Sequence, residues 1–141
     1  MLRNRLRILI LDDFPDRGWV LSRILNSKGY SANSHTFPQN EVDIIEKKNP
    51  DLLILDLIFS EASIVRTLKK IKQNNPSLPV FICFNSVTKQ IKNQATKLGA
   101  SVFSPRAEVE QMLDQIKKLP LVKEERDLVT PCVSKDEKER R

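Results

Sequence analysis

Three aspartates in this sequence are placed so that they could share one cation. Asp12 and Asp13 follow an apolar run that begins at Leu6, and Asp56 lies near the end of a second run that begins at Leu52. Carboxylates that converge on one crevice repel each other unless a cation or a proton lies between them. Hard oxygen ligands at a partly open site suit Mg²⁺, which keeps several of its waters. The aspartates therefore predict a magnesium site, provided that the fold brings the two runs together.

Short strands and amphipathic helices alternate along the chain. Residues 6–11, 52–57 and 80–84 are short runs rich in Ile, Leu, Val and Phe without polar–apolar alternation, which is typical of strands buried on both faces, and weaker strands fit residues 31–37 and 101–103. Apolar residues at helical spacing predict a helix after each strand. These positions are Val20, Leu21, Ile24 and Leu25; Val42 and Ile45; Ile64, Val65, Leu68 and Ile71; Val87, Ile91, Gln94, Ala95 and Leu98; and Val109, Met112, Leu113 and Ile116.

Strict alternation of strand and helix predicts a parallel sheet with helices on both faces. The second strand contains three consecutive polar residues, so it belongs at an edge of the sheet, and the most apolar strands belong in the centre. This gives the order 2-1-3-4-5 with five helices, the flavodoxin-like form of the doubly wound α/β class. Ligands of such sheets bind beyond the carboxyl ends of the strands where the order reverses. That point lies between the first and third strands, where the three aspartates would meet.

The turn after the first strand argues against a nucleotide site. Dinucleotide-binding and P-loop sites need glycines at this turn, because the backbone must approach a phosphate closely. Residues 12–16 read DDFPD, and the first glycine is Gly18. A flavodoxin-type phosphate loop is excluded on the same ground.

Length and composition predict one domain with a charged tail. A chain of 141 residues that is 40% hydrophobic suits a single core. We place this domain at residues 1–120, and a flexible tail at 121–141, where charged residues replace the apolar spacing. No apolar run approaches the roughly 18 residues of a membrane-spanning helix, and the N-terminus does not resemble a signal peptide. We therefore expect a cytoplasmic protein with no membrane partner.

Cysteine and histidine are too few for disulfide or zinc chemistry. Cys83 lies inside an apolar run, where a buried, reduced thiol is expected, and Cys132 lies in the polar tail. His35 is the only histidine, and we expect it at the surface. Zinc sites built on several histidines, and Ser-His-Asp or Cys-His catalysis, therefore lack their residues.

Four stretches resemble the receiver domain of bacterial two-component response regulators. They are ILILDDFP at residues 8–15, PDLLILDL at 50–57, LPVFIC at 78–83 and LGASVF at 98–103. The resemblance extends from about residue 7 to residue 118 without a large gap. The first two stretches and their spacing are the more specific part.

The resemblance implies a role for each acidic residue. Asp56 falls on the phosphoacceptor, Asp12 and Asp13 fall on the acidic pair that holds Mg²⁺, and Ile58 would offer its backbone carbonyl to the metal. The phosphoryl group would come from a phosphohistidine on a histidine kinase or a histidine phosphotransfer protein. Attack by a carboxylate, with Mg²⁺ offsetting the negative charge, is consistent with this set of residues.

The positions that would contact the phosphoryl group depart from the family pattern. Phe84 stands where the family has Thr or Ser, and a phenyl ring cannot donate the hydrogen bond that those residues make. Arg106 stands in the place of the family Lys and keeps its positive charge. Phe103 falls on the family's rotating Tyr or Phe, and two interpretations stay open for it, an aromatic switch and a plain buried ring.

The leading hypothesis is a stand-alone receiver that signals through contacts with an output partner, or through a homodimer. We expect no enzymatic activity beyond assistance to its own phosphorylation. The alternative is a pseudo-receiver that acts as an interaction module without phosphorylation. Nucleic-acid association is less favoured, because the net charge of +6 comes without a nucleic-acid-reading motif. It would rest on the basic residues Arg66, Lys69, Lys70, Lys72, Lys89, Lys92 and Lys97.

Overall fold

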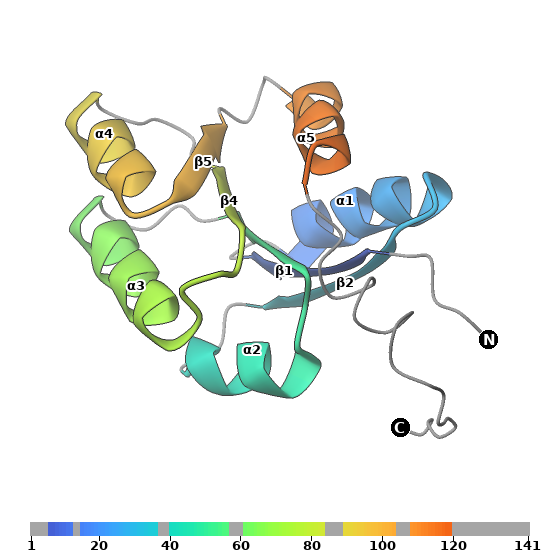
Figure 1. Ribbon diagram of the computed structural model, residues 1–141. Coiled ribbons are helices and arrows are strands. Elements are labelled where there is room, and N and C mark those ends of the chain that lie inside the picture. Colours follow the sequence, from blue (N-terminus) through green and yellow to red (C-terminus); the bar gives the residue numbers. More distant parts are fainter. Residues whose placement is uncertain are drawn as a thin grey trace.

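The computed structural model describes residues 6–12, 15–36, 40–56, 61–83, 89–103 and 108–119. Within these residues, five strands alternate with five helices (Figure 1). The elements are β1 (Arg7–Asp12), α1 (Pro15–Ser27), β2 (Ser31–Thr36), α2 (Glu41–Lys48), β3 (Leu52–Asp56), α3 (Glu61–Asn74), β4 (Val80–Cys83), α4 (Lys89–Lys97), β5 (Ala100–Phe103) and α5 (Glu108–Lys117).

The strands form one parallel sheet in the order β2-β1-β3-β4-β5, which confirms the predicted flavodoxin-like arrangement. The polar strand β2 lies at one edge and β5 at the other. The chain order reverses at β1, whose two neighbours are β2 and β3. The carboxyl ends of β1 and β3 therefore lie side by side at the point where the sequence places a ligand site.

Helices cover both faces of the sheet and enclose two hydrophobic clusters (Figure 1). One cluster joins the sheet to α2, α3 and α4, through residues such as Ile45, Leu68 and Ile91. The other joins it to α1 and α5, through residues such as Leu25 and Met112. Each central strand contributes alternate side chains to the two clusters, as a strand buried on both faces must.

Helix α1 packs on the sheet through small residues, and its buried face therefore differs from the predicted one. The sequence predicts Val20 on the buried side, but 49% of its surface is exposed. The buried positions are instead Gly18, Leu21, Ser22 and Leu25, which follow the same helical spacing. Gly18 and Ser22 are small, so the helix axis comes close to the strands and Val20 turns outward. In α4 the same kind of correction applies to Gln94, which is exposed beside the buried Ala95.

Two turns show how the chain passes from a helix to the next strand. Gly29 has φ +100° after α1, and Gly99 has φ +94° after α4, so both adopt the left-handed backbone that glycine accepts readily. Asn26 then links α1 to β2, because its side-chain amide donates to the carbonyl of Ala32 and accepts from the Ala32 N–H, at 3.0 and 2.9 Å. The two glycines thus follow the ends of α1 and α4, and Asn26 joins the end of α1 to β2.

The proposed tail at residues 121–141 lies outside the described residues, and so does Val87 of the predicted fourth helix. The described structure ends at Leu119, shortly after α5. None of the helices that the structure describes is long and apolar enough to cross a lipid bilayer.

Candidate functional site

One row of side chains crosses the sheet at the carboxyl ends of four strands. Asp12 of β1 is in register with Asp56 of β3, Asp56 with Cys83 of β4, and Cys83 with Phe103 of β5. Cys83 and Phe103 belong to the cluster under α1 and α5, so the row faces these two helices. Asp12 and Asp56 are only 1% and 6% exposed. The predicted convergence of these two carboxylates is therefore confirmed.

Helix α1 packs directly against Asp12. A Cβ atom added at Gly18 would lie 2.7 Å from Asp12 Oδ2, and 3.1 Å from both the Asp12 and Ser34 Cβ atoms. Side chains do not tolerate such distances without moving their neighbours. The absence of a side chain at position 18 is thus what lets the first two turns of α1 lie over the acidic residues.

Arg17 brings a positive charge to the acidic pair. Its Nη2 atom lies 3.2 Å from Asp56 Oδ1, and 37% of the Arg17 side chain is exposed. The sequence analysis assigned the positive charge of the site to Arg106, in place of the family Lys, and not to a residue of α1. Arg17 is the only basic residue between residues 8 and 22, in the first turn of the helix that follows the acidic strand end. This position is a sequence signal that could have indicated the contact between Arg17 and the acidic residues.

The pKa of the Cys83 thiol is shifted by burial and by the charged residues near it. Burial, the nearby Asp56 carboxylate and, more weakly, Asp12 raise the pKa of the Cys83 thiol to about 12, while Arg17 acts in the opposite direction. The thiol is therefore protonated at neutral pH, as expected for a buried, reduced cysteine. It is neither a nucleophile nor a ligand in this state.

Four predicted site residues lie outside the described residues: Asp13, Ile58, Phe84 and Arg106. Phe103 is described and buried, and its ring centroid lies 5.0 Å from that of Phe81, with the ring planes at 49°. This is a favourable tilted arrangement of two aromatic rings. The structure thus shows Phe103 packed inward, and its predicted rotation stays a prediction.

The chemistry of the acidic pair fits Mg²⁺. Asp12 and Asp56 supply only oxygen donors, from adjacent and in-register strand ends, which is the donor type that this ion prefers. Among the described residues no cluster of three or more His, Cys, Asp or Glu side chains is arranged for a metal ion. The expected third carboxylate, Asp13, is outside that set.

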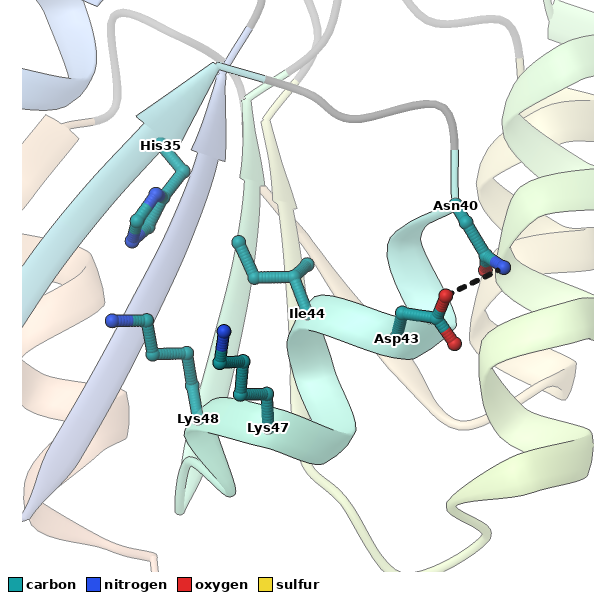
Figure 2. Close-up of a pocket in the computed structure, with 6 residues that line it drawn as sticks. All are labelled: His35, Asn40, Asp43, Ile44, Lys47 and Lys48. Atoms are coloured by element: carbon teal, nitrogen blue, oxygen red, sulfur yellow. Dashed lines mark hydrogen bonds between the residues drawn. The ribbon is translucent and has the colours of Figure 1, made fainter.

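A separate depression of about 380 Å³ lies between β2 and α2 (Figure 2). His35 is in register with Leu11, which packs on the α2 side of the sheet, so the depression lies on the opposite face from Arg17. It is lined by His35, Asn40, Asp43, Ile44, Lys47 and Lys48. Partial burial and the charge of Lys48 lower the pKa of His35. Of the predicted site residues that the structure describes, Asp12, Asp56 and Phe103, none lines this depression.

A family model matches most of this chain. The response regulator receiver domain matches residues 8–117, from the start of β1 to the end of α5. The chain belongs to this family. The receiver domain is a signalling domain of two-component systems, so the resemblance drawn from the four sequence stretches is confirmed.

Two curated relatives place this receiver among different kinds of protein. The transcriptional regulatory protein ZraR of Salmonella typhimurium is 30% identical over 102 residues, which are 71% of this chain and 23% of that protein. The sporulation initiation phosphotransferase F of Bacillus subtilis is 27% identical over 117 residues, which are 82% of this chain and 94% of that protein. The chain thus spans about a quarter of the first relative and nearly all of the second.

A solved structure agrees in fold. A CheY-like response regulator receiver domain protein from Methanospirillum hungatei superposes with a TM-score of 0.73 at 19% identity. The match covers 88% of this chain and 99% of that one. It supports the five-stranded parallel architecture described above.

Proposed function

We propose that this receiver accepts a phosphoryl group on Asp56. The observation that carries the proposal is the position of Asp56, a buried carboxylate at the carboxyl end of the central strand β3, with Asp12 in register beside it. An Asp56 oxygen would attack the phosphorus of a phosphohistidine, the P–N bond would break, and the imidazole would leave with a proton from water. The donor would be a histidine kinase or a histidine phosphotransfer protein.

Magnesium would be held by Asp12, Asp13, Asp56 and the backbone carbonyl of Ile58. When bound, it would offset the negative charge of the acceptor and of the transferred oxygens. The chain's own part is to hold two carboxylates at adjacent strand ends and to exclude bulk water from them, which their burial achieves.

The state of the site would be read by an output partner through protein contacts, or by a second copy of the chain in a homodimer. Arg106 would contact the phosphoryl group in place of the family Lys, and Phe84 would supply no hydrogen bond. Phe103 would be the aromatic switch, if its ring leaves the packed position beside Phe81. The receiver would have no enzymatic activity beyond aiding its own phosphorylation, and it would act in the cytoplasm with its kinase.

One relative supports phosphotransfer as the function. The sporulation initiation phosphotransferase F of Bacillus subtilis, which is 27% identical over 117 residues, is named a phosphotransferase. We therefore favour phosphotransfer and protein contact over promoter binding. The basic residues of α3 and α4, including Arg66, Lys69, Lys89 and Lys92, are exposed, as solvated helix faces usually are.

Phosphotransfer from a small phosphodonor tests this function. Purified protein is incubated with acetyl phosphate and Mg²⁺, and intact mass measures the addition of one phosphoryl group. We expect labelling of the wild type and of Asp114→Asn, which removes an exposed carboxylate on α5, and none of Asp56→Asn. An unlabelled wild type with an intact circular dichroism spectrum would contradict the proposal and leave the pseudo-receiver as the interpretation.

A further inference from the structure

Asp56 has a charged partner on helix α1. The Arg17 guanidinium reaches Asp56 from the first turn of α1, across a distance of 3.2 Å. The approach of this turn is fixed by the next residue, because Gly18 lies directly against Asp12. The packing of the α1 backbone thus holds the Arg17 guanidinium beside Asp12 and Asp56, while part of the Arg17 side chain stays in contact with solvent.

Two changes can release Asp56 from this pair, a competing cation and neutralisation of the carboxylate, because a guanidinium stays charged in proteins. Magnesium needs an oxygen of the same carboxylate, and two cations within a few ångströms repel each other.

We propose that Arg17 is a resident counter-ion of Asp56 that Mg²⁺ must displace, so that Arg17 sets the affinity of the site for the metal. The inference rests on the proposed function in one respect, the use of Asp56 as a metal ligand. Arg17 is a positioning residue here. Its long side chain is already 37% exposed, so it has a route to solvent when the metal enters. In the metal-free protein it relieves the repulsion between Asp12 and Asp56.

Calorimetric titration with MgCl₂ measures this effect directly. We expect Arg17→Gln to bind Mg²⁺ roughly tenfold more tightly than the wild type, a factor that corresponds to about 1.4 kcal/mol. Arg17→Lys keeps the charge and should stay close to the wild type. The matched control is Arg23→Gln, which removes one positive charge from an exposed position of the same helix, stacked on Trp19, and should leave the affinity unchanged.

Thermal unfolding supplies a second measurement. Without metal, Arg17→Gln should melt at a lower temperature than the wild type, because the substitution removes a positive charge that lies 3.2 Å from the Asp56 carboxylate. Saturating Mg²⁺ should reduce the difference in melting temperature between Arg17→Gln and the wild type, because the variant binds the metal more tightly.

The outcomes separate this inference from the proposed function. Equal Mg²⁺ affinities for the wild type and Arg17→Gln, or no binding by either, would overturn the counter-ion role, whether or not Asp56 is labelled by acetyl phosphate. Tighter binding by Arg17→Gln without labelling of Asp56 in any variant would uphold the counter-ion role and contradict the phosphoacceptor.

Discussion

Gly18 reverses the usual preference of a helix for alanine over glycine. Glycine in a helix interior costs roughly 0.5–1 kcal/mol relative to alanine, because it loses more backbone freedom on folding. Here a Cβ would lie 2.7 Å from a buried Asp12 oxygen and 3.1 Å from the Ser34 Cβ. The close approach of α1 to the acidic row outweighs the helix preference.

Gly18→Ala should therefore lower the free energy of unfolding by about 1–3 kcal/mol, the usual cost of overpacking. It should also displace Asp12 and weaken metal binding. Chemical denaturation monitored by circular dichroism measures the first effect. A more stable Gly18→Ala protein would show that α1 can shift outward without cost.

Cys83 should make the protein less stable at alkaline pH. Its folded pKa of about 12 lies above the ordinary value of 9.0, so between these pH values the unfolded thiol ionises and the folded thiol does not. Stability due to this group is complete below pH 9 and is lost as the pH rises toward 12. The slope approaches roughly 1.4 kcal/mol per pH unit.

The measurement is the free energy of unfolding of the wild type and of Cys83→Ala at several pH values from neutral to alkaline. The contributions of lysine and tyrosine cancel in this comparison, so the difference isolates Cys83. Parallel curves for the two proteins would mean that the thiol ionises with equal ease in the folded chain.

The sequence predicts that Asp12 and Asp56 lie side by side, but it does not predict the ion pair between Asp56 and Arg17. The meeting follows from strand order alone, since a polar second strand forces β1 and β3 to be neighbours. The contact depends on how closely one helical turn approaches the sheet, and that distance is set by the small residue at position 18. Hydrophobic periodicity contains no such information, and it also places Val20 on the wrong side of α1.

At the scale of the elements, α2 and α3 are joined by an ion pair whose acidic member is buried. Glu41, at the start of α2, is almost inaccessible, and its Oε1 atom lies 3.3 Å from Nζ of Lys70 on α3. The lysine is half exposed. A buried carboxylate that loses its partner keeps its desolvation cost, so removing the lysine should destabilise the protein even though the net stabilisation by the intact pair is small.

Lys70→Ala should reduce the free energy of unfolding by about 1 kcal/mol. This loss is smaller than that for a fully buried ion pair, because solvent screens the half-exposed lysine. The matched control is Lys69→Ala, which removes the adjacent exposed lysine and should change stability little. Both are measured by urea denaturation. Equal losses for the two variants would assign the effect to net charge and not to the pair.

Much of the buried face of α1, α3 and α5 is predictable from the spacing of apolar residues. Leu21, Leu25, Ile64, Leu68, Ile71, Met112 and Ile116 are all buried, as their spacing predicts. Buried Glu41 has no such signal, because a carboxylate at the start of a helix normally faces solvent and the N-terminal peptide groups. Its partner lies on another helix, so only the packing of α2 against α3 reveals the pair.

At the scale of the whole molecule, Mg²⁺ should raise the melting temperature saturably. The ion would bind the folded site and not the unfolded chain, so at ten times the dissociation constant the gain is about 1.4 kcal/mol. Asp13→Ala should abolish this dependence, and Asp43→Asn, an exposed change on α2, should not. Differential scanning fluorimetry with and without millimolar MgCl₂ measures it, and identical curves would favour the pseudo-receiver.

Strand β1 lies inside the sheet, between β2 and β3, although it precedes both of these strands in the chain. Its partner β2 follows within a short stretch of chain, but its other partner, β3, is complete only at Asp56. Until then, an edge of consecutive Ile and Leu residues has no neighbour on the nascent chain. Such edges pair readily with other chains. Products of interrupted translation that end before β3 should thus be aggregation-prone, because the strand that brings Asp56 beside Asp12 is also the strand that covers the open edge of β1.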